Sequence, residues 1–255
     1  MTDAYSFVKA QYDCIGETYE KSKQLPLARF VERPSVSRLL GDIQGRNVLD
    51  LACGSGFYTR LARRMGASRV TGVDVSAEMV GVAERIEEQE PLGIGYRVGD
   101  AMALPSLGAF DTVMAIYLLN YADSQEAMQA MARTAAANLR PGGTFLSFNA
   151  RPDLDLDGAS LSRYGFSFDR AEPLRTGTRI RVSVATVPPF DFHACLQHAS
   201  VYEEAFTAAG FEDFVWTPTE LSFDGILEFG TPYWQSYFDN PPWVSFRCRR
   251  SAEVG

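Results

Sequence analysis

Short apolar segments alternate with longer amphipathic segments through the middle of the chain. The apolar segments, residues 47–52, 69–75, 94–100, 110–119 and 144–150, have the lengths and compositions of buried strands. The intervening segments show helical periodicity, most clearly at residues 57–65, 76–90 and 123–139. Because neighbouring parallel strands need a right-handed crossover, this alternation predicts a parallel sheet with helices on both faces.

The pattern changes after residue 150. Residues 151–166 are polar and rich in turn formers, whereas residues 178–187 alternate, with Ile180, Val182 and Val184 on one face. Such alternation is typical of an antiparallel strand with one solvated face, and residues 191–198 could pair with it. Residues 201–210 predict a further helix, and residues 211–221 and 243–250 predict the last two strands.

The length and hydrophobic content favour one domain with insertions. A chain of 255 residues, 46% of them hydrophobic, can bury one sizeable core. We therefore expect a single domain over residues 1–255, with a ligand-binding core at residues 46–150. Residues 1–45 would form a helical lid, residues 151–200 a cap insertion, and residues 201–255 the C-terminal part of the sheet.

Charge and cysteine usage disfavour several kinds of partner. A formal net charge of -8 disfavours binding to nucleic acid. The four cysteines lie far apart, without a C-x-x-C pair or grouped histidines, so we expect free thiols and no metal site. The first residues lack the apolar run of a signal peptide, and no apolar stretch reaches about 18 residues. We expect a cytoplasmic protein that does not bind a membrane.

A glycine turn follows the first predicted strand, in the sequence NVLDLACGSGFYTRLA at residues 47–62. Gly54 and Gly56 let the backbone approach a ligand closely, but Thr59 stands where a dinucleotide fingerprint has its third glycine. Asp74 lies 20 positions after Gly54, at the end of the second strand, where a carboxylate can accept both hydroxyls of a ribose. The pattern predicts a nucleotide-like cofactor and disfavours NAD or FAD, although a purely structural turn stays open.

Four segments in order resemble the motifs of class I S-adenosylmethionine-dependent methyltransferases: VLDLACGSGFYT, VTGVDVSAEMV, GDAMALP and LRPGGTFLSF. The segments YDCIGETYEKS, YLLNYA and TPYWQSYFDNPPW are more loosely similar to small bacterial secondary-metabolite methyltransferases of the toxoflavin type, which serve antibiotic biosynthesis. The resemblance implies a Rossmann-like, doubly wound, seven-stranded and mainly parallel α/β sheet. It also implies an antiparallel C-terminal strand, an N-terminal helical lid and a cap on the acceptor side.

The same resemblance implies S-adenosylmethionine as the cofactor and S-adenosylhomocysteine as its product. The glycine turn would lie under the methionine part, Asp74 would bind the ribose and Asp100 the adenine amino group, whereas Met79 could equally be a core residue. The implied cofactor-binding residues are Asp50, Cys53, Gly54, Ser55, Gly56, Asp74, Val75, Met79, Asp100, Ala101, Tyr117 and Leu118.

The acceptor side offers fewer signals. Methyl transfer from a sulfonium depends mainly on holding the acceptor atom close to the methyl group. A base is needed only if the acceptor must lose a proton. The candidate catalytic residues are Tyr12 and Tyr19, whose rings could flank the sulfonium, and His193 as a base. The candidate acceptor-binding residues are Asn120, Tyr121, Asn149, His198, Tyr233 and Trp234. Ordinary packing or solvent exposure stays open for each of these residues.

We therefore expect a methyltransferase for a small aromatic or heteroaromatic metabolite, with nitrogen favoured over carbon or oxygen as the methylated atom. A nicotinamide-dependent oxidoreductase and a non-catalytic module that binds S-adenosylmethionine are the alternatives. The first would share the turn and Asp74 but should carry a third glycine. The sequence does not predict the oligomeric state.

Overall fold

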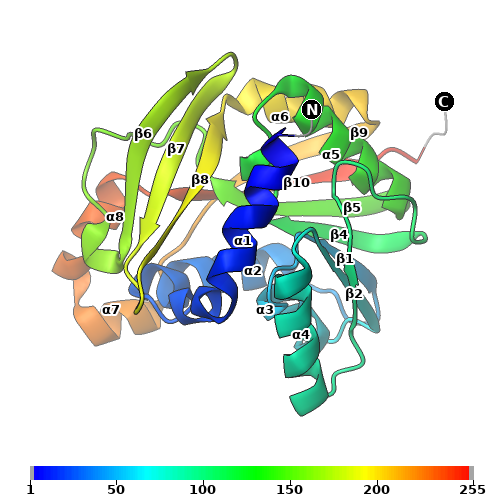
Figure 1. Cartoon of the computed structure of the whole chain (residues 1–255), viewed down its shortest axis with the longest axis horizontal. Coiled ribbons are helices and arrows are strands. Elements are labelled where there is room, and N and C mark those ends of the chain that lie inside the picture. Colours follow the sequence, from blue (N-terminus) through cyan, green and yellow to red (C-terminus); the bar gives the residue numbers. More distant parts are fainter. Residues whose placement is uncertain (1–2, 253–255) are drawn as a thin grey trace.

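A seven-stranded mixed sheet organises the molecule, with strand order β3-β2-β1-β4-β5-β10-β9 (Figure 1). The computed structural model describes residues 3–252, and the side chains of all of these except residues 3–8, 14, 16 and 17. Strands β1 to β5 are parallel, and β10 is antiparallel to both β5 and β9, which confirms the predicted sheet. Its strands are β1 (Asn47–Leu51), β2 (Arg69–Asp74), β3 (Gly95–Val98), β4 (Phe110–Ile116), β5 (Leu139–Ala150), β9 (Phe211–Pro218) and β10 (Trp243–Arg250).

The central strands β1, β2 and β4 are buried on both faces because they carry apolar residues on both faces. In β1, Val48 belongs to one hydrophobic cluster and its neighbour Leu49 to another. Helices α2 (Arg33–Leu40) and α3 (Phe57–Arg64) contribute to the first cluster. Helices α5 (Gln125–Asn138) and α6 (Ala199–Ala208) contribute to the second. The alternation of strands and helices therefore places helices on both faces, as predicted.

Helix ends follow local capping chemistry. The Ser76 hydroxyl accepts the backbone N–H of Met79 and begins α4 (Ala77–Gln89), as a serine at this position favours. The equivalent cap of α5 is Ser124, which accepts the N–H of Ala127, and not the neighbouring Asp123. The segment RPGG does not separate α5 from its strand, because α5 ends at Asn138 and β5 begins at Leu139.

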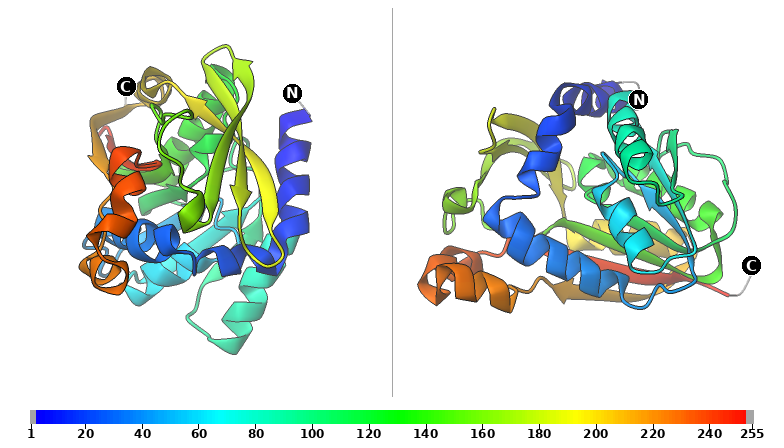
Figure 2. Two further views of the ribbon diagram at one scale, coloured as in Figure 1. Left: turned by 90° about the vertical axis from the view of Figure 1, so that its left-hand side faces the viewer. Right: turned by 90° about the horizontal axis from the view of Figure 1, so that it is seen from below.

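Residues after β5 build a second, three-stranded antiparallel sheet: β6 (Phe166–Leu174), β7 (Gly177–Val184) and β8 (Phe190–Gln197). Ile180, Val182 and Val184 are buried, as their alternation predicts. The small sheet stands beside the large one, with helix α1 (Asp3–Ser22) crossing in front of the space between them (Figure 1). Figure 2 shows α1 from below, where it reaches from α4 to β8, and it contacts both elements.

Shorter helices complete the chain. They are the π-helix η1 (Ala28–Glu32), the 3₁₀ helices η2 (Leu119–Tyr121), η3 (Ser162–Tyr164) and η4 (Thr231–Trp234), and the α-helices α7 (Phe223–Phe229) and α8 (Gln235–Asp239). Among the helices that the structure describes, none combines the length and apolarity needed to cross a membrane.

Candidate active site

The glycine turn joins β1 to α3 at the carboxyl end of β1. Gly54 and Gly56 have φ values of +53° and +81°, a region that L-residues with a side chain rarely adopt. A Cβ on Gly56 would also overlap the hydroxyl of Tyr96 in β3. The turn therefore needs glycine for its backbone conformation and for its close approach to the neighbouring strand.

Asp74 ends β2 beside this turn and is 7% exposed. Its carboxylate accepts the backbone N–H of Gly54 at 2.8 Å and that of Ser76 at 2.9 Å. Burial raises the pKa of Asp74, and the two backbone donors partly offset this effect. The carboxylate thus fixes the turn and still borders the cavity described next.

A cavity with an empty volume of about 830 Å³ lies at the carboxyl ends of β1, β2 and β4, and we call it the edge cavity. Open α/β sheets bind ligands at this edge. Seven of the predicted cofactor residues line it: Gly54, Asp74, Val75, Asp100, Ala101, Tyr117 and Leu118. The glycine turn and the ends of β2 and β4 therefore converge on one space.

Five predicted cofactor residues lie behind this lining. Asp50 is 1% exposed, accepts the Thr59 hydroxyl at 2.6 Å, and has its other oxygen without a partner. Ser55 donates its hydroxyl to Glu20, and Met79 is fully buried in the core. Cys53 and Gly56 are parts of the turn that do not border the cavity. All five residues lie where they can support the turn, and none of them lines the edge cavity.

The edge cavity also has walls that the sequence reasoning missed. Met102 follows β3, and Ala127 and Met131 lie one turn apart on α5. The spacing of four between Ala127 and Met131 shows that they share a helix face, but not that this face borders a cavity. Asp123, which precedes the Ser124 cap of α5, lines the cavity and lies 3.6 Å from Arg179 of the small sheet.

Helix α1 is attached to the cofactor edge of the large sheet by polar contacts. Ser76 donates its hydroxyl to Asp13, and Glu20 accepts the Ser55 hydroxyl and pairs with Arg60 at 3.1 Å. These contacts place Tyr12 and Tyr19 of α1 over the edge cavity.

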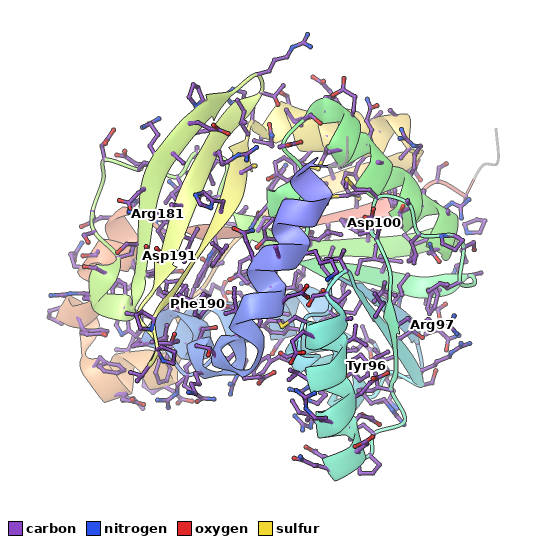
Figure 3. All side chains as sticks on the ribbon, viewed as in Figure 1. Tyr96, Arg97, Asp100, Arg181, Phe190 and Asp191 are labelled. Atoms are coloured by element: carbon purple, nitrogen blue, oxygen red, sulfur yellow. The ribbon has the colours of Figure 1, made fainter. Side chains whose placement is uncertain are left out.

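A second cavity, with an empty volume of about 560 Å³, lies between α1, the small sheet and the ends of β5 and β10. Its wall is mostly apolar, and we call it the aromatic cavity after the rings that line it: Phe166, Phe168, Phe190, Phe192 and Trp243. In Figure 3, Asp100 of the edge cavity and Phe190 of the aromatic cavity lie on opposite sides of α1.

Four tyrosines line both cavities: Tyr12, Tyr19, Tyr117 and Tyr121. The hydroxyls of Tyr12 and Tyr121 share a hydrogen bond, and their rings meet edge to face at 5.9 Å. Burial raises the pKa of all four phenols, which keeps them neutral at physiological pH. The two cavities therefore adjoin across a wall of neutral aromatic rings.

The predicted acceptor residues are only partly brought together. Asn120 lines the aromatic cavity, where its side-chain oxygen accepts the N–H of Ala150, and Tyr121 lines both cavities. Asn149 is fully buried, donates to Ser147 and lines neither cavity.

The predicted aromatic wall of Tyr233 and Trp234 lies elsewhere. Trp234 is fully buried and donates its ring N–H to the carbonyl of Gly225, whereas Tyr233 stacks on Phe229. These rings fill the core beneath α7, and the small sheet and Trp243 supply the wall of the aromatic cavity instead.

Neither histidine is among the described residues that line the edge cavity or the aromatic cavity. His193 lies in β8 opposite Arg181, and its neighbours Phe192 and Ala194 face the aromatic cavity. Because side chains alternate along a strand, the side chain of His193 lies on the other face of the small sheet. His198 is exposed and follows the end of β8. The structure therefore places His193 and His198 outside the walls of both cavities.

Comparison with known proteins adds an independent observation. Residues 48–143 match the family model described as a methyltransferase domain, and they include the glycine turn, Asp74 and Asp100. This segment of the chain is similar to a methyltransferase domain. The match supports the cofactor that the motifs imply, S-adenosylmethionine.

Two curated relatives match parts of the chain. The ubiquinone biosynthesis O-methyltransferase of Coxiella burnetii (strain Dugway 5J108-111) is 34% identical over 102 residues, which cover 40% of this chain and 42% of that one. The ribosomal protein L11 methyltransferase of Burkholderia mallei (strain NCTC 10229) is 36% identical over 99 residues, covering 39% and 30%. The matches thus span less than half of either relative.

One solved structure matches almost the whole chain. The DhpI-SAM-HEP complex is 20% identical, covers 98% of this chain and 99% of its own, and has a TM-score of 0.66. At this identity the similarity establishes the fold.

Proposed function

We propose that this protein transfers the methyl group of S-adenosylmethionine to a small acceptor with an aromatic or heteroaromatic ring, and that the methylated atom is a nitrogen. One observation carries the proposal: the edge cavity of the methyltransferase-like segment adjoins a second cavity walled by aromatic side chains. The wall of that cavity is mostly apolar with a few polar groups, as is typical of small-molecule sites.

The edge cavity offers the groups that a nucleoside with an amino-acid tail requires. Asp74 would bind the ribose hydroxyls, because its buried carboxylate is held in place by two backbone donors. Asp100 and Ala101 would bind the adenine, with Met102 against the ring. Tyr117 and Leu118 would lie beside the sulfonium at the end of β4.

The residues behind the cavity would act through the turn. Cys53, Ser55 and Gly56 shape it, and Asp50 would orient the ammonium group of the methionine part through the turn backbone. Met79 would support the turn from the core, since it lies below Gly54.

The bound cofactor supplies an activated methyl group, so the residues of this chain mainly position the acceptor and exclude water. Helix α1 and the small sheet would serve as the lid and the cap of this site. The rings of Tyr12 and Tyr19 would separate the reacting atoms from solvent, and Asn120 and Tyr121 would contact the acceptor.

The choice of nitrogen follows from the groups in the wall. Neither cavity has a histidine among its described lining residues, and burial keeps the four shared tyrosines neutral. The Glu32 carboxylate in the wall of the aromatic cavity is already paired with Lys23 and Tyr58. A neutral ring nitrogen or amine attacks with its own lone pair and needs no base before the transfer. A role in secondary metabolism rests on the looser resemblance of the flanking segments.

A two-part experiment tests the proposal. In calorimetry, S-adenosylmethionine and S-adenosylhomocysteine should bind and NAD should not. Binding of NAD alone would instead support an oxidoreductase. Transfer of labelled methyl from S-adenosylmethionine is then measured against matched panels of aromatic amines, N-heterocycles and phenols. We expect transfer to nitrogen acceptors. Cofactor binding without transfer to any panel member would support the non-catalytic alternative.

A further inference from the structure

Two charged residues lie in the wall of the otherwise apolar aromatic cavity. Lys23 follows the end of α1 and is 3% exposed, and Glu32 ends η1 and is 2% exposed. They are the only charged residues among the described residues that line this cavity. The sequence analysis did not single out either residue.

The two side chains hold each other in a defined arrangement. The Lys23 ammonium lies 2.5 Å from Oε1 of Glu32, and the Tyr58 hydroxyl donates to the same oxygen. The ammonium also lies over the ring of Tyr19, at 4.8 Å from its centroid, and over that of Tyr117, at 5.3 Å. Since these two rings border both cavities, the ammonium lies where the aromatic cavity meets the edge cavity.

Folding alone does not account for a charged pair in this place. Moving two charges out of water costs several kcal/mol per ion, and well-packed apolar replacements of a buried pair are often neutral or stabilising. The cation–π contacts offset part of this cost. A pair that borders a cavity has a second use, because a ligand can complete its hydrogen bonds.

We propose that Lys23 and Glu32 together bind an amide-like edge of the acceptor, with a ring carbonyl facing the ammonium and the adjoining N–H facing the carboxylate. This inference rests on the proposed function, since it takes the aromatic cavity as the acceptor site. An ammonium has three donors and no acceptor, whereas a carboxylate only accepts. Lys23 therefore needs a hydrogen-bond acceptor on the ligand and Glu32 needs a donor, and an amide edge carries the two side by side.

The net charge of the pair also selects this class of ligand. Because the two charges cancel, an anionic ligand attracted to Lys23 would be repelled by Glu32. A cationic ligand attracted to Glu32 would likewise be repelled by Lys23. A neutral dipolar edge satisfies both residues without adding charge to an apolar space. The aromatic rings of the wall suit the flat ring to which such an edge belongs.

The test uses the full chain saturated with S-adenosylhomocysteine and four bicyclic probes of similar size. Quinolin-2(1H)-one carries the amide edge. N-methylquinolin-2-one and 2-methoxyquinoline lack its N–H, and naphthalene lacks all polar groups. In calorimetric or fluorescence titrations, we expect quinolin-2(1H)-one to bind about 10- to 100-fold more tightly than the other three, because none of these can donate a hydrogen bond to the Glu32 carboxylate. This comparison needs no variant.

A variant then assigns the preference to the pair. Lys23→Met/Glu32→Leu/Tyr58→Phe replaces all three polar partners with apolar groups, so that no charge is left alone. The control Arg64→Gln/Glu90→Gln removes an exposed ion pair at 2.6 Å. We expect the triple variant to keep its binding of S-adenosylhomocysteine and naphthalene and to lose the preference for quinolin-2(1H)-one, while the control keeps it.

Two results would overturn the inference. One is equal affinity of the unmodified protein for the four probes. The other is a preference that persists in the triple variant, because that would assign discrimination to the shape of the cavity. Failure of the proposed function is distinguishable from both, since it would appear as absent binding of S-adenosylhomocysteine before any probe is added.

Discussion

Asp50 should make the stability of the cofactor-free protein fall as pH rises. The residue lies in β1, is 1% exposed, and has one carboxylate oxygen without a hydrogen-bond partner. Burial raises the pKa of Asp50 from 3.8 to about 8, and the negative charge of Asp74 acts in the same direction. The Thr59 hydroxyl, which donates to the other oxygen, offsets part of the effect.

The sign follows from proton binding in the two states. Between pH 4 and pH 8 the native protein holds the Asp50 proton while the unfolded chain has released it. The free energy of unfolding therefore decreases with rising pH across this window. The shift from 3.8 to about 8 corresponds to roughly 6 kcal/mol at about 1.4 kcal/mol for each pKa unit. This stabilisation is fully present below the pKa of Asp50 in the unfolded chain, and it is lost as pH rises through the pKa of Asp50 in the native protein.

Asp50→Asn isolates this contribution, because asparagine is similar in shape to a protonated aspartate and does not titrate. Urea unfolding of both proteins between pH 4 and pH 8, without cofactor, gives the difference in unfolding free energy. We expect the unfolding free energy of the variant to increase by several kcal/mol relative to that of the unmodified protein as pH rises. Glu84→Gln, at an exposed position of α4, should show no such trend. Parallel pH curves for Asp50→Asn and the unmodified protein would refute the reasoning.

Three further predictions follow from the geometry. Gly56→Ala should destabilise the protein in urea by about 1–3 kcal/mol more than Gly93→Ala, because both positions have positive φ but only a Cβ on Gly56 meets Tyr96. Equal losses would exclude the steric contact. His193→Ala should leave the pH–rate profile of methyl transfer unchanged, since its side chain faces away from the aromatic cavity. Loss of one limb of the pH–rate profile near neutral pH would instead support His193 as a base. Asp111→Asn should cost stability above pH 4 and progressively less below it, because the N–H of Asn47 and the Arg140 guanidinium lower the pKa of Asp111. Urea unfolding from pH 2 to pH 7 measures this, and a constant cost would contradict it.

The cofactor side of the molecule could be predicted because its signals are local. Gly54, Gly56 and Asp74 lie within one strand–turn–helix–strand unit, and their backbone roles follow from spacing alone. The strict alternation around Ile180 likewise indicates its buried face without any tertiary information.

The acceptor side could not be predicted in the same way because it is assembled from distant segments. Lys23 and Phe192 line one cavity although 169 positions separate them in the chain. Alternation predicts that His193 and its two neighbours face opposite sides of the strand, but only the packing of the small sheet decides which side borders the cavity. Trp234 belongs to an aromatic-rich segment, and such a segment does not reveal what its rings pack against.

The central claim is that Asp74 and the glycine turn hold S-adenosylmethionine in the edge cavity. Its most direct test is calorimetric titration of S-adenosylmethionine into the unmodified protein, Asp74→Ala and the control Glu84→Ala, with circular dichroism to confirm that each is folded. The account predicts equal affinity for the unmodified protein and the control, and about 100-fold weaker binding to Asp74→Ala, because buried ribose hydroxyls lose their acceptor. Unchanged affinity in a folded Asp74→Ala variant would contradict it.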